Sequence, residues 1–174
     1  MVLFWALFVV AGAIYFTMMW VTLPVLLAEA GGLRPLDFRP FGYSHAEVQT
    51  YLNALSEEGV ATYVGLQQQL DMIYPAVLAA TFIIGFRALF PRGLARLLTV
   101  VALIGAMADY AENALVWAIL TQPLTVGEVN LASAFTMVKS AAGAICFLVL
   151  IGVALRYVLG LVGVIARPGA SAGH

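Results

Sequence analysis

The sequence predicts an all-α polytopic membrane protein, a bundle of four transmembrane helices with a short amphipathic extramembrane helix between the first two. Of its 174 residues, 63% are hydrophobic and 10% are charged, whereas about 25% of residues are charged in soluble domains. Four apolar runs are each long enough to cross a bilayer, which takes about 20 residues. Too little sequence remains for a soluble catalytic domain, so we predict one membrane domain over residues 1–167.

The charge balance and the cysteine content exclude several classes of function. The formal net charge is −1, so we expect no nucleic-acid partner. The single cysteine, Cys146, lies inside an apolar run, which excludes an internal disulfide and a cysteine-pair metal motif. Because no histidine lies in a predicted span, we expect neither haem nor zinc, and we predict no cofactor and no metal site.

The first span is predicted over residues 2–28. The Ala-Glu-Ala pattern at its end is typical of a signal-peptide cleavage site, but no basic residue precedes it, so we expect an uncleaved span. Pro24 is expected to kink the far end of this helix. Gly31 and Gly32 are expected to terminate it.

The extramembrane helix is predicted over residues 44–57. Two prolines make the preceding residues, 31–43, an irregular loop. Ser44 and Glu47 form the S-x-x-E capping box that is typical of a helix start. The apolar residues that follow recur at helical spacing, so this helix should lie on the membrane surface or cap the bundle.

The other three spans are predicted over residues 68–90, 94–120 and 131–159. Gly59 is expected to separate the extramembrane helix from the second span. A tight Phe-Pro-Arg-Gly turn at residues 90–93 joins the second span to the third, and Pro123 follows the end of the third. The tail over residues 168–174, rich in Gly, Ala and Ser, is predicted to be disordered.

The distribution of arginines predicts the orientation. Two arginines lie on one predicted side of the membrane, and five lie on the other, which are Arg87, Arg92, Arg96, Arg156 and Arg167. Basic residues favour the cytoplasmic side of a membrane. We therefore predict a multi-pass protein of the plasma (inner) membrane with both termini in the cytoplasm and the segment between the first two spans outside.

Two carboxylates and an amide interrupt the third span. Asp109, Glu112 and Asn113 have i, i+3, i+4 spacing and share one helix face, which must point into protein because a carboxylate facing lipid is costly. Lys139, the only lysine, lies as deep in the fourth span as Glu112 lies in the third, counted from their outer ends. We therefore predict a salt bridge from Lys139 to Glu112 or Asp109.

Further polar and aromatic residues enter the same half of the bundle, and we expect an outward-facing polar cavity roofed by the extramembrane helix. Its predicted ligand-binding residues are Tyr15, Trp20, Asp71, Tyr74, Asp109, Glu112, Asn113 and Lys139. The alternative is structural, with the lysine pair only setting the register of two helices. Three intramembrane acids exceed what one lysine can pair with, which favours a functional site.

Three motifs resemble a group of bacterial four-span integral membrane proteins. They are Pro40-Phe-Gly-Tyr-Ser44, Gln69-Leu-Asp71-Met-Ile-Tyr74-Pro75 and Ala108-Asp109-Tyr-Ala-Glu112-Asn113. This resemblance covers most of the chain and implies no activity. The architecture alone is similar to the sterol-isomerase and sigma-2-receptor-like four-helix membrane domains, and no catalytic residue is carried over from them.

Three functions fit these features. The first is a non-catalytic module in the lipid bilayer that binds a lipid-like small molecule, or docks on a larger membrane complex, through the cavity. The second is an enzyme acting on a lipid or isoprenoid, with Asp109 or Glu112 as the catalytic acid or base. The third is a proton- or cation-coupled transporter, as a homo-oligomer because four helices leave little room for a pore. Binding is favoured, because the sequence shows few convergent polar groups and few polar residues in the inner halves of the spans.

Overall fold

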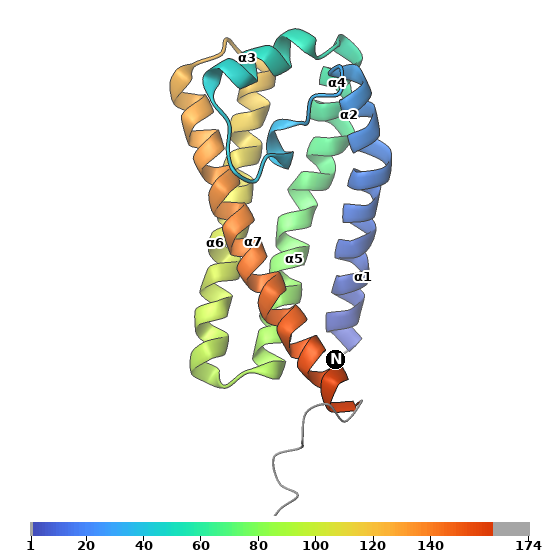
Figure 1. Ribbon diagram of the computed structural model, residues 1–174, viewed down its shortest axis with the longest axis vertical. Coiled ribbons are helices and arrows are strands. Elements are labelled where there is room, and N and C mark those ends of the chain that lie inside the picture. The colour runs from blue at the N-terminus through green and yellow to red at the C-terminus, as the bar shows by residue number, and fades with distance from the viewer. Residues whose placement is uncertain (1, 162–174) are drawn as a thin grey trace, which may run out of the picture.

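The computed structural model describes residues 2–161 and consists of helices with short connections (Figure 1). Four helices are long and apolar enough to cross a membrane: Val2–Glu29, Glu57–Leu89, Arg92–Thr121 and Val126–Gly160. The predicted all-α bundle of four spans is therefore confirmed. The N-terminus and the turn between the second and third spans lie at the lower end in Figure 1, and the extramembrane segment lies at the upper end. The tail predicted to be disordered lies outside the described residues.

Three segments stack end to end in the first span: α1 (Val2–Thr17), the π-turn η1 (Met18–Thr22) and α2 (Leu23–Glu29). Pro24 has no backbone N–H to donate, so the regular hydrogen-bond ladder cannot continue through it. The backbone N–H of Leu23 reaches back five residues to the carbonyl of Met18. The expected disturbance at Pro24 thus takes the form of a π-turn directly before it.

The segment between the first two spans contains two short helices, η2 (Leu36–Phe38) and α3 (His45–Ala54). Ser44 caps α3, because its Oγ accepts a hydrogen bond from the backbone N–H of Glu47 at 3.3 Å. In return the Glu47 carboxylate accepts from the backbone N–H of Ser44 at 2.7 Å, so the predicted capping box is confirmed. α3 lies across the upper end of the bundle, whereas the chain before it descends between the spans (Figure 1).

The second span consists of α4 (Glu57–Thr62), a second π-turn, η3 (Tyr63–Gln67), and α5 (Gln68–Leu89). The prediction that Gly59 separates this span from α3 is wrong, because the break falls at Ser56, whose Oγ accepts from the backbone N–H of Gly59 at 3.1 Å and starts the helix. The helix therefore begins well before residue 68. Gly59 allows close packing instead, since a Cβ there would lie 2.9 Å from Cβ of Glu29.

The third and fourth spans, α6 (Arg92–Thr121) and α7 (Val126–Leu161), form an antiparallel hairpin. A Cβ at Gly105 of α6 would lie only 3.0 Å from Cβ of Ala142 of α7, so small residues do bring the two backbones close together. α7 then crosses the bundle diagonally toward the lower end of α1 (Figure 1). There Phe4 and Leu150 both lie against Gly85 of α5.

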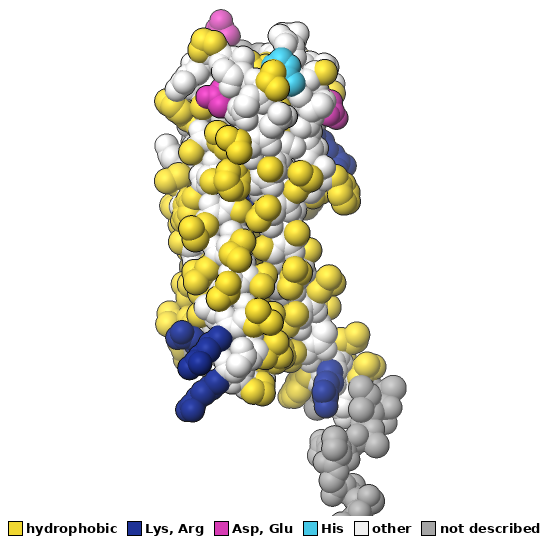
Figure 2. All heavy atoms as spheres, turned by 90° about the vertical axis from the view of Figure 1, so that its left-hand side faces the viewer, with side chains coloured by type: hydrophobic (Ala, Val, Ile, Leu, Met, Phe, Trp, Pro, Cys, Tyr) yellow, Lys and Arg dark blue, Asp and Glu magenta, His cyan; other side chains and the backbone are white. Residues whose placement is uncertain are grey.

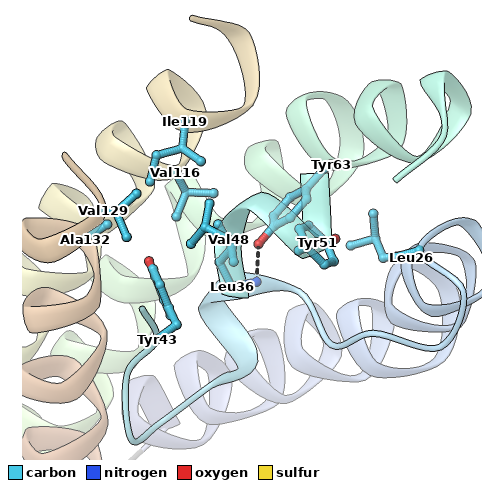
Figure 3. Close-up of a cluster of buried hydrophobic side chains, with 11 residues drawn as sticks. Leu26, Leu36, Tyr43, Val48, Tyr51, Tyr63, Val116, Ile119, Val129 and Ala132 are labelled. Carbon is cyan, nitrogen blue, oxygen red and sulfur yellow. Dashed lines mark hydrogen bonds between the residues drawn. The ribbon is translucent and has the colours of Figure 1, made fainter. Parts of the chain in front are cut away.

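Two hydrophobic clusters hold the ends of the bundle together. The upper cluster joins the extramembrane segment to the spans and includes the residues labelled in Figure 3, which are Leu26, Leu36, Tyr43, Val48, Tyr51, Tyr63, Val116, Ile119, Val129 and Ala132. Within it, the hydroxyl of Tyr63 accepts a hydrogen bond from the backbone N–H of Leu36 at 3.1 Å. The lower cluster consists of Phe82, Phe86, Leu98, Ala102 and Cys146. The polar residues described below lie between these two clusters.

The outer surface is consistent with a lipid environment. On the face shown in Figure 2, hydrophobic side chains cover most of the length of the bundle. Most of the visible basic side chains gather at the lower end, and the acidic ones lie near the upper end. Apolar flanks bounded by charged ends are typical of a multi-pass membrane protein.

Candidate functional site

The middle of α6 is joined to α7 by an ion triad, which consists of Asp109, Glu112 and Lys139. Nζ of Lys139 lies 3.0 Å from Oδ1 of Asp109 and also pairs with Oε2 of Glu112. The predicted salt bridge between the third and fourth spans is therefore confirmed, and it joins the lysine to both acids. The Glu112 side chain is fully buried, and Thr136 Oγ1 donates a hydrogen bond to its other oxygen, Oε1. Both oxygens thus have the polar partners that a buried carboxylate requires.

A second polar group, the Gln67 network, consists of Thr22, Asp37, Tyr63, Gln67 and Asp71. Gln67 is fully buried. Its amide nitrogen donates to Oδ2 of Asp71 at 2.8 Å and to Oδ2 of Asp37 at 3.3 Å, and its amide oxygen accepts from the Thr22 hydroxyl. The Tyr63 hydroxyl donates to Oδ1 of Asp37. The network therefore joins the first and second spans to the descending loop, which is the segment between α2 and α3 that contains Asp37.

Both π-turns end at this network. The turn η1 ends at Thr22, η3 ends at Gln67, and these two residues are hydrogen-bonded to each other. A π-turn shifts the direction of the side chains that follow it, and such turns are frequent at functional sites. The paired π-turns thus bring Thr22 and Gln67 to the same level of the bundle.

Amide and hydroxyl side chains link the second span to the third beside the ion triad. Nδ2 of Asn113 donates to the backbone carbonyl of Asp71 at 3.0 Å, and Nε2 of Gln68 donates to the backbone carbonyl of Asn113 at 3.2 Å. The Tyr110 hydroxyl donates to the backbone carbonyl of Met72 at 3.1 Å. Hydrogen bonds between helices contribute to packing within membranes. These three hydrogen bonds join the helix segment that carries Asp71 to the helix segment that carries the acids of the triad.

A cavity of about 360 Å³ lies between the four spans. Its upper part is lined by the ionisable side chains of Asp37, Asp71, Asp109 and Lys139. The lining below them is apolar and includes Leu78, Ala79, Phe82, Ala102, Cys146 and Phe147. Side chains of the first span and of α7 both contribute to the lining, together with those of α5 and α6. The cavity thus has a polar upper part and an apolar lower part.

Five of the predicted ligand-binding residues line this cavity, and they are Tyr15, Asp71, Tyr74, Asp109 and Lys139. The rings of Tyr15 and Tyr74 stack against each other, with centroids 6.1 Å apart. The extramembrane helix α3 was expected to roof the cavity, but no residue of α3 lines it. Asp37 and Phe38 of η2 line it instead. The loop that contains Asp37 and Phe38, and not α3, therefore forms this part of the cavity wall.

The other three predicted residues lie elsewhere. Glu112 and Asn113 are buried behind the lining, where Glu112 holds Lys139 and Asn113 holds the backbone of the second span. Trp20 lies on the outer surface, where its side chain is 70% exposed and its ring stacks on Phe16. Glu112 and Asn113 thus lie next to the cavity without lining it, whereas Trp20 lies away from it.

Asp37 is the candidate residue that sequence reasoning missed, because it belongs to the segment that is predicted to lie outside the membrane. The descending loop places it in the cavity wall instead. Burial raises the pKa of the Asp37 carboxyl above its ordinary value, while the nearby charge of Lys139 opposes this shift. One signal was present, since Leu33, Leu36 and Phe38 make the loop apolar and favour its packing against the protein.

Comparison of the chain with protein-family models, with curated proteins and with solved structures found no match. The resemblance to bacterial four-span proteins therefore stays a prediction. Among residues 2–161, no group of three His, Cys, Asp or Glu side chains is arranged to hold a metal ion. The shape and lining of the cavity are thus the basis for a function.

Proposed function

We propose that this protein is a non-catalytic module of the plasma (inner) membrane that binds a single-chain, lipid-like amphiphile in the cavity. The supporting observation is the division of the lining into an ionisable upper part and an apolar lower part. An amphiphile has the same division, so its head and its chain would each meet a matching surface. The volume of about 360 Å³ lies near the lower limit of ligand pockets, roughly 300–1,000 Å³, which favours one chain over two.

The ligand would enter sideways from the bilayer. The cavity is partly open to the surface, and residues of both α1 and α7 line it. Both helices expose large apolar side chains on their outer faces, among them Val9 and Phe16 of α1 and Leu148 and Ile151 of α7. Lipid chains would therefore surround the opening, and an amphiphile could reach the cavity without crossing water.

The same geometry bears on the enzyme and transporter alternatives. An enzyme would use Asp109, which lines the cavity, as the acid or base, with Lys139 and the buried Glu112 behind it. A transporter would need polar groups that continue toward the lower end, where the described lining is apolar. Binding without reaction therefore accounts best for a cavity that is polar at only one end.

The charge distribution supports an orientation for this site. The turn between α5 and α6 follows Arg87, near the end of α5, and precedes Arg92 and Arg96 at the start of α6. We assign this lower end to the cytoplasmic side, because basic residues favour it. Both termini would then be cytoplasmic, and the polar part of the cavity would lie nearer the outer surface.

A cavity-filling variant tests the proposal without touching the ion triad. Gly143 lines the cavity, and no atom lies within 4 Å of the position that its Cβ would take, so Gly143→Leu fills the space without a clash at Cβ. Gly152→Leu is the matched control, since Gly152 lies on the same helix, outside the lining, with equally free space. Both variants gain the same helix propensity.

Wild type and both variants would be extracted gently from their own membrane and analysed by native mass spectrometry with lipid identification. We expect a single-chain amphiphile on wild type and Gly152→Leu, and at least about tenfold less on Gly143→Leu, which corresponds to about 1.4 kcal/mol. Equal amounts on all three proteins, or none on any, would contradict the proposal. A protein partner on all three without a small molecule would favour docking on a larger membrane complex.

A further inference from the structure

We infer that the cavity selects amphiphiles whose headgroup is a protonated amine, an inference that rests on the proposed function. Its basis is an imbalance of charge in the polar part of the lining. Three carboxyl groups, those of Asp37, Asp71 and Asp109, face one cation, Lys139. The fully buried Glu112 adds a fourth carboxyl directly behind the lysine.

The positive charge of Lys139 is already balanced by carboxyl groups of the protein. Lys139 pairs with Asp109 and Glu112 on the facing helix. An anionic headgroup at Lys139 would compete with these two acids and would also approach the carboxyls of Asp37 and Asp71. Like charges at short range in a partly buried site are strongly disfavoured. Carboxylate and phosphate headgroups are therefore poor ligands for this cavity.

The other two acids have no cation of their own. In the described part of the chain, both salt bridges involve Lys139, and no basic side chain lies within 4.0 Å of the carboxyl of Asp37 or Asp71. The Asp71 residue is only 5% exposed. Among the described residues its Oδ2 accepts one hydrogen bond, from Gln67, and its Oδ1 accepts none. Because Asp71 lines the cavity and its Oδ1 is not completely buried, a donor from a ligand can reach this oxygen.

The Gln67 network supplies only neutral donors to these acids. The Gln67 amide and the Tyr63 hydroxyl occupy lone pairs of the two carboxyls without balancing their charge. An ammonium group carries a positive charge and three donors. Asp37 and Asp71 both accept a hydrogen bond from the same nitrogen of Gln67, so their carboxyls lie close together in the cavity wall. Hydrogen bonds between charged partners are about twice as strong as neutral ones.

Three probes with the same alkyl chain separate the headgroup from the chain: dodecylamine, dodecanol and dodecanoate. Each would be added at equal concentration to the full-length protein in detergent micelles at neutral pH, and bound probe would be measured by native mass spectrometry. Binding to Gly143→Leu defines the non-specific background. We expect wild type to bind the amine at least about tenfold more than the alcohol, and the carboxylate least.

Two acid variants test which carboxyls select the amine. Asp71→Asn should reduce the preference for the amine over the alcohol to about threefold or less, because the amine loses a charged partner. Asp37→Asn tests the same contact from the loop and serves where Asp71→Asn does not fold. Glu58→Gln is the control, because it removes an exposed acid at the same end of the bundle, outside the cavity.

The outcomes separate this inference from the proposed function. Equal binding of the three probes, all lost in Gly143→Leu, would refute the amine preference and leave amphiphile binding intact. An amine preference that survives in both acid variants, or that Glu58→Gln weakens equally, would refute the assignment of Asp37 and Asp71. No binding above the Gly143→Leu background for any probe would overturn both proposals.

Discussion

Removal of Lys139 perturbs the ion triad most directly. Lys139→Met deletes the only cation beside two carboxylates and keeps an unbranched side chain. Glu112, which is fully buried, loses the partner of its Oε2, and loss of one partner of a buried ion pair costs about 3–5 kcal/mol. Asp109 adds little, because its side chain is 14% exposed and lines the cavity, where water can solvate it. We expect the free energy of unfolding to fall by about 3 kcal/mol.

Glu112→Gln should lower the free energy of unfolding by less than Lys139→Met does, by about 1–2 kcal/mol. The amide keeps an oxygen that can accept from Thr136, and Lys139 keeps Asp109 as its partner. In the double variant Lys139→Met with Glu112→Gln, no buried carboxylate is left without a cation at position 112. The double variant should therefore lose less free energy of unfolding than the two single variants lose in sum, with a coupling energy of about 1–2 kcal/mol.

Unfolding would be measured by reversible titration of mixed micelles with SDS, followed by tryptophan fluorescence. Glu58→Gln is the control and should stay within about 0.5 kcal/mol of wild type, because this exposed acid has no ion-pair partner among the described residues. Strictly additive losses in the double variant would refute the coupling of Lys139 with Glu112.

The remaining predictions concern the loop, the helix contact and the topology. Because burial raises the pKa of Asp37, the folded protein holds this proton more tightly than the unfolded chain, so stability should fall as pH rises from the ordinary pKa of 3.8 through the raised one. Unfolding of Asp37→Asn should show a shallower fall over that range, and an unchanged slope would contradict the burial of this carboxyl. Gly105→Ala should be about 1–2 kcal/mol less stable than Gly143→Ala. The new Cβ at position 105 would lie 3.0 Å from Cβ of Ala142, whereas a Cβ at position 143 meets nothing within 4 Å. Equal unfolding midpoints would argue against this close contact. In a cysteine-free background, a membrane-impermeant thiol reagent applied outside should label Thr125→Cys and not Gly93→Cys, and the opposite labelling would reverse the orientation.

The sequence alone determined the four spans and the depth of the ion triad. Lipid offers the backbone no hydrogen bonds, so long apolar runs form helices whatever they pack against. A helix rises about 1.5 Å per residue, so counting from the helix ends placed Glu112 and Lys139 at the same level, and the observed ion pair agrees. The Ser44 capping box was equally predictable, because it depends only on residues within one turn.

Only the tertiary structure decided which side chains meet across the bundle. Tyr15 and Trp20 belong to the same span, but the π-turn η1 begins between them, and Tyr15 lines the cavity while Trp20 lies on the outer surface. The position of Asp37 depends on hydrogen bonds from Tyr63 and Gln67, which lie 26 and 30 residues later in the chain. Contacts between such distant residues are set by how the spans pack and not by local spacing, so the loop's position in the cavity wall could be seen only in the folded protein.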